Sequence, residues 1–204
     1  MYLPERFAIK DLEKTLRIIR EYPFATLVSI EAGEPFVSHI PLIAEVDSQD
    51  QVTLIGHLAR ANPHSRLLSD RPVYAIFHGP NSYITPRWYK QYDVPTWNYA
   101  VVHVRGHVKL IEDEDGIHEC LRKLSDQVEG DAPDRWEFGI TEDLAKPGVL
   151  AKAIVGFQIK VDAVQSKFKL GQNRSAADRQ GVEQGLAERG DSMAHAMIAL
   201  MREG

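Results

Sequence analysis

The stretch AVVHVRGHVKLI at residues 100–111 places strong limits on the fold of this chain of 204 residues. If it is extended, Val102 and Val104 point one way, whereas His103 and Arg105 point the other way. A strand with one apolar and one polar face is typical of an antiparallel sheet that packs a core on one side and meets water on the other. The chain is therefore expected to build an antiparallel sheet.

Other strand patterns do not alternate regularly with helices. Strands are expected at residues 24–30, 35–46, 52–58, 73–78, 100–111 and 155–161, and helices at 10–21, 63–69 and 117–128. Pro41 indicates an edge strand or a bulge. This order argues against a doubly wound parallel sheet and favours an α+β, mainly β, barrel-like antiparallel domain with peripheral helices. We expect a single domain over residues 1–204, in which 175–204 form a helical C-terminal extension broken at Gly190.

The composition is ordinary for a soluble protein, with 44% hydrophobic and 26% charged residues. A net charge of −5 argues against a chain built mainly to coat nucleic acid or an anionic membrane. Cys120 is the single cysteine, so no internal disulfide can form, which fits a reducing compartment. The start, MYLPERF, lacks a signal-peptide pattern, and no apolar run approaches the roughly 18 residues of a membrane helix. A cytoplasmic protein without a membrane segment is expected.

Residues 56–65, GHLARANPHS, join the end of a predicted strand to the start of a predicted helix. Asn62 suits a helix N-cap and Pro63 the first helical position. Arg60 can bind a phosphate through two N–H groups, and Gly56 would let a ligand approach the backbone closely. The segment therefore indicates a phosphate site at a helix start. The alternative is an ordinary capped helix with a solvated arginine.

Residues 166–175, SKFKLGQNRS, combine basic and amide side chains without an acid. The basic residues are Lys167, Lys169 and Arg174, and the amides are Gln172 and Asn173. This chemistry suits a phosphate, or the carbonyls and ring nitrogens of a flat heterocycle. The alternative is a solvated basic loop after the last strand.

Residues 79–99 hold six large aromatic side chains in one loop-like span. They are Tyr83, Trp88, Tyr89, Tyr92, Trp97 and Tyr99. Aromatics at this density line interfaces or pockets for planar ligands, and so long a loop in a compact domain is itself a sign of function. The alternative is a small separate core beneath the loop.

Other catalytic chemistries find little support. His103 and His107 share a strand face, but strand residues four apart lie roughly 13 Å from each other, too far for one metal ion. No HExxH, CxxC, GxSxG, GxGxxG or Walker motif occurs. Cys120 lies on the apolar stripe of a predicted helix, where a buried, inert thiol is expected. We therefore expect no metal site and assign no catalytic residue.

Six segments together point to a known family. They are MYLPERF, ATLVS (25–29), GHLARANP (56–63), GPNSYITPRWY (79–89), VPTWNY (94–99) and KFKLGQNRSAADR (167–179). In this order they resemble PaiB-type proteins, which are described as FMN-binding negative transcriptional regulators. The resemblance covers nearly the whole chain. It implies the FMN-binding split barrel shared with pyridoxamine phosphate oxidases and flavin reductases: an antiparallel Greek-key barrel, normally a homodimer, with the flavin between subunits.

The resemblance also implies site residues. The phosphate and ribityl chain of FMN are expected along His57, Leu58, Ala59, Arg60 and Asn62. Lys169, Gln172 and Asn173 are expected to close the site, from the same chain or the partner subunit, and further candidates are Thr96, Trp97 and Asn98. The chain departs from the family pattern at Gly171, where the family usually has Ser, and at His64, where Trp is expected after Asn-Pro.

The implied function is that of an FMN-binding negative regulator, and the residues favour action through the flavin over direct DNA readout. The C-terminal helices from Ala176 onward carry more acidic than basic side chains, and no helix-turn-helix is visible. Direct DNA binding stays an open alternative. Two others are a flavin-dependent oxidoreductase of the pyridoxamine phosphate oxidase-like class, with His57 as the acid or base to test, and a haem-binding split-barrel protein with His57 as axial ligand.

Overall fold

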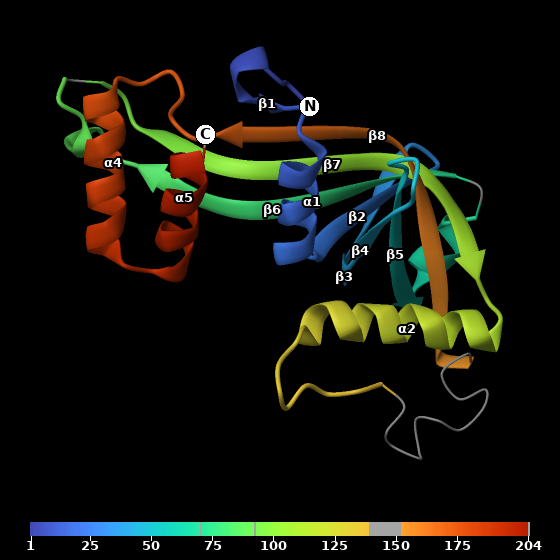
Figure 1. Ribbon diagram of the computed structural model, residues 1–204. Coiled ribbons are helices and arrows are strands. Elements are labelled where there is room, and N and C mark those ends of the chain that lie inside the picture. The colour runs from blue at the N-terminus through green and yellow to red at the C-terminus, as the bar shows by residue number, and fades with distance from the viewer. Residues whose placement is uncertain (70, 92, 139–151, 204) are drawn as a thin grey trace. The chain divides into compact units, whose positions relative to one another are not determined.

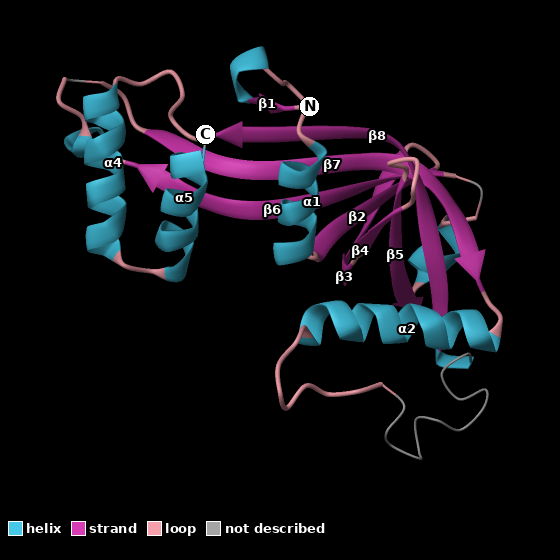
Figure 2. Ribbon diagram, viewed as in Figure 1, coloured by secondary structure: helices cyan, strands magenta, loops and turns pink. Residues whose placement is uncertain are grey.

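The computed structural model describes residues 1–204 except 70, 92, 139–151 and 204 (Figure 1). Within this part of the chain eight strands form one sheet in the order β3-β2-β6-β7-β8-β5-β4, and β1 pairs with β8 beside this path (Figure 2). The strands are β1 Ala8–Ile9, β2 Phe24–Glu31, β3 Glu34–Pro41, β4 Ile43–Val46, β5 Val52–Ala59, β6 Pro72–Ile84, β7 Thr96–Ile111 and β8 Ile154–Lys169.

The helices lie where the apolar spacing predicts them. They are α1 Leu12–Glu21, α2 Glu114–Glu129, α4 Ala176–Arg189 and α5 Ser192–Glu203, with 3₁₀ turns at Glu5–Phe7, Pro63–Leu67 and Pro86–Trp88. Gly190 has a φ of +66° and caps α4, so the predicted break in the C-terminal helices is confirmed. None of the helices in the described ranges is long and apolar enough to cross a membrane.

The predicted antiparallel class is confirmed, with an open rather than a closed sheet. The pairs β2–β3, β2–β6, β4–β5 and β5–β8 are all antiparallel. The single strand expected over residues 35–46 is wrong, because the chain forms two strands that end up at opposite edges of the sheet. Pro41 has no N–H for a ladder and ends β3, and the fully buried Leu42 then donates its N–H to the carbonyl of Pro23 at 2.9 Å.

Strand β7 shows the predicted alternation. Val102, Val104 and Val108 are buried, whereas Arg105 and His107 on the opposite face are exposed. The outward face carries an ion pair, in which Nδ1 of His107 lies 2.8 Å from a carboxylate oxygen of Asp162. One face of β7 therefore packs a core and the other meets solvent.

Strands β6 and β8 extend beyond the predicted ends at His78 and Val161. In β6, Gly79 and Pro80 are both buried, and burial alternates again from there to Ile84. Part of the loop expected over residues 79–99 is therefore strand. In β8, residues 162–165 are exposed on both faces, and no period of two marks them in the sequence. A strand without a buried face gives no hydrophobic pattern, which is why β8 was expected to be short.

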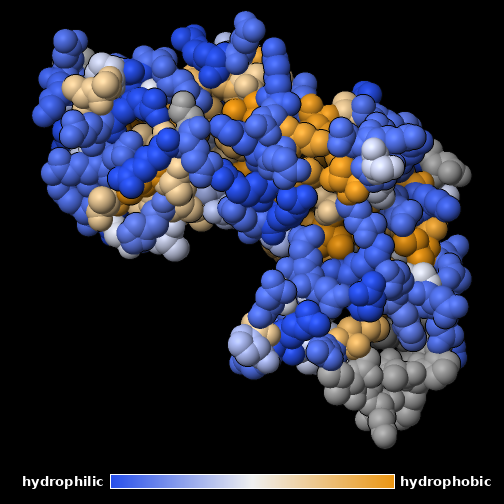
Figure 3. All heavy atoms as spheres, in the orientation of Figure 1, coloured by the Kyte–Doolittle hydropathy of each residue, from blue (hydrophilic) through white to orange (hydrophobic). Residues whose placement is uncertain are grey.

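Residue contacts divide the chain into two compact units. The first unit comprises residues 1–18, 78–102 and 165–204, and the second comprises 19–77 and 103–164. The long strands β6, β7 and β8 each contribute residues to both units. The expected single domain over residues 1–204 stays a prediction. On the face drawn in Figure 3, hydrophilic side chains predominate.

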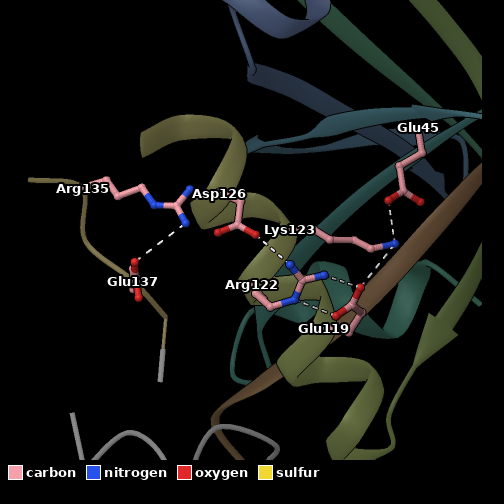
Figure 4. A network of polar contacts seen from close by, with 7 residues as sticks. All are labelled: Glu45, Glu119, Arg122, Lys123, Asp126, Arg135 and Glu137. Carbon is pink, nitrogen blue, oxygen red and sulfur yellow. Dashed lines mark hydrogen bonds and ion pairs between the residues drawn. The ribbon is translucent and has the colours of Figure 1, made fainter. Parts of the chain in front are cut away.

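In the second unit, α2 packs its apolar stripe on β4 and β5. Cys120 and Leu124 form one buried cluster with Ile43 and Ile55. The polar side of the helix carries the network drawn in Figure 4, where Nζ of Lys123 lies 2.6 Å from a carboxylate oxygen of Glu45 on β4. The remaining members of this network lie on α2 or in the segment after it; they are Glu119, Arg122, Asp126, Arg135 and Glu137. Such exposed pairs contribute little to stability, so the apolar contacts hold the helix.

In the first unit, Trp88 anchors the aromatic segment on α4. A Cβ added at Gly181 would lie 2.0 Å from the carbonyl oxygen of Trp88, and one added at Gly185 would lie 2.1 Å from its indole ring. The two glycines, one helical turn apart, therefore make room for Trp88. Trp88 is half-buried in this contact, and a separate small core beneath the aromatic span stays a prediction. Met197 and Met201 of α5 are fully buried and belong to the core of the first unit, whereas Met193 of the same helix is 37% exposed.

Candidate functional site

The Arg60 segment, residues 56–65, runs from the end of β5 into the 3₁₀ turn of the second unit. Asn62 caps the turn as predicted, because its Oδ1 accepts the N–H of His64 at 3.0 Å. The turn spans the five residues Pro63–Leu67, so it has little of the dipole of a longer helix. An anion at this place would depend on Arg60 and on individual N–H groups.

Arg60 is held by the protein. Its Nη2 donates to the carbonyl of Ile154 at 3.0 Å, and its Nη1 lies 3.7 Å from a carboxylate oxygen of Glu112. Its backbone N–H donates to the carbonyl of Ala153 at 2.8 Å. The Arg60 side chain as a whole is 41% exposed.

The side chains before Arg60 are placed unequally for contact with a ligand. Leu58 is buried and can offer only its backbone, whereas Ala59 is exposed. The idea that Gly56 admits a ligand is wrong: a Cβ there would lie 2.4 Å from Cδ2 of Leu42, so the space at this glycine is filled by the protein. Gly56 is needed for packing within the second unit.

His57 is a half-buried, neutral histidine. Burial lowers the pKa of its imidazole below the ordinary value. Its Nδ1 is buried and has no hydrogen-bond partner among the described residues. An unpaired buried polar atom costs free energy, so His57 is a point where a bound group or a small shift would be stabilising.

His64 forms a buried polar cluster that the sequence did not reveal. The ring is fully buried, with Nδ1 2.9 Å from Oγ of Ser38 and Nε2 2.9 Å from Oγ of Ser29. Asn62 also donates from Nδ2 to Oγ of Ser38 at 3.1 Å, and the ring of Phe36 lies 4.9 Å from the imidazole. Burial lowers the pKa of His64, so the ring is neutral at pH 7. Both ring nitrogens of His64, at the position where Trp is expected, therefore have hydrogen-bond partners.

Four of the six predicted residues of the first unit line a polar cavity of about 90 Å³, called the Lys169 cavity below. Its polar lining consists of Thr96, Asn98, Lys169, Asn173, Arg174 and Arg179. Four of these belong to the predicted set, and the two arginines extend it. Gly171, where the resemblance leads us to expect Ser, lines the cavity too, with a φ of +81°.

Lys169, at the end of β8, is fixed beside β7. Its Nζ donates to Oγ1 of Thr96 and, at 2.9 Å, to the carbonyl of Trp97. Burial, followed by the positive charges of Arg174 and Lys167, lowers the pKa of the ammonium. Trp97 contributes its backbone here, while its side chain is 54% exposed.

Gln172 shapes the turn instead of reaching into the cavity. Its Nε2 donates to the carbonyl of Phe168 at 2.7 Å, and its Oε1 accepts the N–H of Leu170 at 2.8 Å. Lys167 is also structural: it is buried, donates to the carbonyl of Tyr2 at 3.1 Å, and its Nζ lies 5.4 and 5.3 Å from the ring centroids of Tyr2 and Tyr99. Basic residues two positions apart on β8 therefore have different roles.

A second, wider hollow of about 470 Å³ lies on the outward face of β6 and β7 in the first unit. Its lining includes His78, Asn81, Trp97 and Tyr99. Trp97 meets Tyr83 edge to face, with ring centroids 6.0 Å apart. An exposed tryptophan beside a wide, mainly apolar hollow suits a planar ligand or a protein surface.

The predicted site residues therefore fall into two sets. His57, Leu58, Ala59, Arg60 and Asn62 lie in the second unit, and Thr96, Trp97, Asn98, Lys169, Gln172 and Asn173 lie in the first. Within the described residues no group of histidine, cysteine and acidic side chains could hold a metal ion.

A family model described as "Putative FMN-binding domain" matches residues 1–163. The chain belongs to this family. FMN, the predicted cofactor, is the ligand that the family description names. The chain is also 34% identical over 209 residues to "Protease synthase and sporulation protein PAI 2" of Bacillus subtilis, covering 100% of this chain and 97% of that protein. The resemblance to PaiB-type proteins is thereby confirmed.

Two solved structures share the family's fold at low identity. The "FAD and Heme binding protein" of Mycobacterium smegmatis matches with a TM-score of 0.64 and 16% identity, over 85% of this chain and 78% of that one. The "Flavocytochrome Anf3" of Azotobacter vinelandii matches with a TM-score of 0.61 and 18% identity, over 79% and 69%. These matches confirm the split-barrel fold that the resemblance implied.

Proposed function

We propose that this protein is a PaiB-type FMN-binding protein whose regulatory effect acts through the flavin. The observation that carries the proposal is the match of the FMN-binding family model to residues 1–163. The Arg60 segment is the part of the family motif with a partly exposed arginine side chain, and a guanidinium binds phosphate well. The bound flavin would supply redox chemistry, and the protein would supply binding and orientation.

The charges of the C-terminal helices support action without direct DNA readout. Residues 176–203 contain three arginines against five acidic side chains, a difference of two negative charges. Arg189 donates to Asp191 at 2.6 Å, and Arg202 donates to Glu183 at 2.9 Å. A helix that binds the DNA backbone needs cations free to pair with phosphates, and here two of the three are already paired with carboxylates.

The test is an FMN titration of the purified chain, read by quenching of flavin fluorescence. We expect Arg60→Gln to weaken FMN binding by about tenfold or more, because a charge-assisted contact to phosphate is lost. Riboflavin, which lacks the phosphate, should bind both forms equally. Arg66→Gln is the matched control, since Arg66 lies exposed on the same turn and its loss changes the net charge equally. Equal FMN affinity of both variants and the unmodified chain would refute the role of Arg60.

The same purified protein can be used to test the three alternative functions, namely oxidoreductase activity, haem binding and direct DNA binding. Addition of reduced nicotinamide nucleotide to the FMN-loaded protein reports oxidoreductase activity as bleaching of the flavin absorbance. Haemin titration reports haem binding as a Soret band, which His57→Ala should remove if His57 is the axial ligand. Salt-dependent, sequence-selective binding to promoter DNA would favour direct DNA readout.

We further infer a homodimer that uses the exposed apolar face of β2, β3 and β6 in the second unit. Val28 on β2 pairs with Val37 on β3 and with Tyr74 on β6, so the three side chains form one row across the sheet. Val37 and Tyr74 are each 46% exposed, and Phe24 on the same face is 66% exposed. A contiguous apolar patch of this kind is typical of an interaction surface. Sedimentation velocity of Val37→Glu, which should yield monomers, tests it. The cytoplasmic location stays a prediction.

A further inference from the structure

We propose that the Lys169 cavity is a binding site for a phosphate-sized oxyanion, which reaches it either as the phosphate of the flavin or as the acidic group of a substrate. Binding of an oxyanion in this cavity does not depend on the proposed flavin function. Only the assignment of that oxyanion to the flavin phosphate rests on it.

The size of the cavity suits a small ion. A water molecule needs roughly 10–15 Å³ of such volume, so about 90 Å³ holds several waters or one tetrahedral oxyanion. Pockets that bury a whole drug-sized ligand measure roughly 300 Å³ or more. The cavity therefore excludes a flavin ring but admits a phosphate, sulfate or carboxylate group.

The charge of the cavity selects an anion. Three cations line it, Lys169, Arg174 and Arg179, and none of the described residues in its lining is a carboxylate. Arg174 pairs with Asp93 and stacks on Tyr89, with Cζ 4.5 Å from the ring centroid, and Asp178 also acts on Arg174. Three cations against these two carboxylates leave one positive charge.

Among the residues that the structure describes, no carboxylate pairs with Lys169. Each charged group that shifts the pKa of its ammonium, Arg174 and Lys167, is itself positive. An ammonium has three N–H donors, and in the described part of the chain Thr96 and the carbonyl of Trp97 take two of them. The remaining donor and the repulsion among the cations both favour an anion as the third partner.

The donors of the cavity are held in place before a ligand arrives. Arg179 donates to the carbonyl of Met201, which is fully buried in α5. Asn98 is 3% exposed, and its Nδ2 lies 3.8 Å from the sulfur of Met201. Donors fixed by buried neighbours lose little entropy when they bind, so the site needs no large rearrangement.

The first experiment measures binding of inorganic phosphate to the ligand-free full chain by isothermal titration calorimetry. We expect saturable binding, weakened about tenfold or more by Lys169→Gln, whose amide can still donate to Trp97. Arg202→Gln is the control, because Arg202 is an exposed cation of the first unit outside the cavity. Absence of saturable binding, or an equal loss in the control, would overturn the site.

A second pair of variants tests the cavity even if Lys169→Gln does not fold. Asn173 is exposed at the cavity and Gln180 is exposed on α4 outside it, so both should tolerate an acid. Asn173→Asp should weaken phosphate binding about threefold or more through like-charge repulsion, whereas Gln180→Glu should not. An equal effect of the two would show that general surface charge, rather than the cavity, attracts the anion.

Competition identifies the source of the anion. If the flavin phosphate occupies the cavity, FMN should displace inorganic phosphate and riboflavin should not. If the acidic group of a substrate occupies it, phosphate should bind the FMN-loaded protein as well as the free protein. Failure of FMN to bind at all would refute the proposed flavin function but would leave the phosphate titration and its variants intact as a test of the cavity.

Discussion

The buried cluster around His64 leads to a prediction about stability. Ser38→Ala removes the oxygen that serves both Nδ1 of His64 and Nδ2 of Asn62. Each buried polar atom left unpaired costs about 1–3 kcal/mol. The side chain of Asn62 is only half-buried, and its amide can bind water instead, so the loss of its hydrogen bond costs about 1 kcal/mol. We therefore expect the free energy of unfolding to drop by about 2–4 kcal/mol.

The assay is urea denaturation followed by circular dichroism. Ser29→Ala removes a partner from Nε2 of His64 alone and should cost less, about 1–3 kcal/mol. Ser48→Ala, an exposed serine in a turn of the same unit, is the control and should change stability by less than about 0.5 kcal/mol. The triple change Ser29→Ala, Ser38→Ala and His64→Leu removes all the buried polar groups together and should recover most of the loss. If Ser38→Ala and Ser48→Ala unfold at the same urea concentration, the reasoning is refuted.

The pH dependence provides a second check on the same cluster. Burial lowers the pKa of His64 in the folded protein below the ordinary 6.5 that applies to the unfolded chain. At pH values above 6.5 the His64 imidazole is neutral in both the folded and the unfolded chain, so its titration does not reduce the free energy of unfolding. As the pH falls further, the unfolded chain takes up a proton that the folded protein resists, so the free energy of unfolding decreases until the pH reaches the lowered pKa. His64→Leu should flatten this acid loss, and the part that remains includes the contribution of His57, whose pKa is lowered in the same way.

Two further predictions concern packing and the single thiol. Gly185→Ala should destabilise the protein by about 1–3 kcal/mol in the same urea assay, because its Cβ would meet the indole of Trp88; Gln184→Ala, exposed on the same helix, should change it by less than about 0.5 kcal/mol. Burial raises the pKa of Cys120 to about 11, so a disulfide reagent at pH 8 should label the folded chain at least about a hundredfold more slowly than the urea-unfolded chain. Equal labelling rates would contradict the burial of Cys120.

Much of the sheet could be predicted because buried strand faces leave a period of two in the sequence. The valines of β7 correctly predicted which face of the strand is buried and which is exposed to water. The same rule failed at residues 162–165 of β8, which are exposed on both faces, and at Leu42, where two strands meet without a polar turn. Hydrophobic pattern reports burial rather than hydrogen bonding, so strand segments without a buried face cannot be predicted from it.

The polar cluster of His64 shows which contacts of a site cannot be predicted from the sequence. Asn62 could be identified as a cap because a cap acts on its immediate neighbours. Ser29 and Ser38 could not be connected to His64, because their meeting depends on the register of β2 with β3, in which Ser38 lies opposite Leu27 and Ser29 opposite Phe36. Contacts fixed by register need the fold before they can be named.

The basic run of residues 167–174 shows the same limit for charge. In the sequence its three cations look alike, and the structure gives each a different state. Lys167 lies between two tyrosine rings and Arg174 pairs with Asp93. Lys169 faces the cavity and pairs with no acid among the described residues. The acid that distinguishes Arg174 from Lys169 lies 81 residues away along the chain, so no local pattern could reveal it. A count of basic residues therefore overstates the positive charge available to an anion. Of the three cations, Lys169 is the one whose neutralisation should weaken anion binding most.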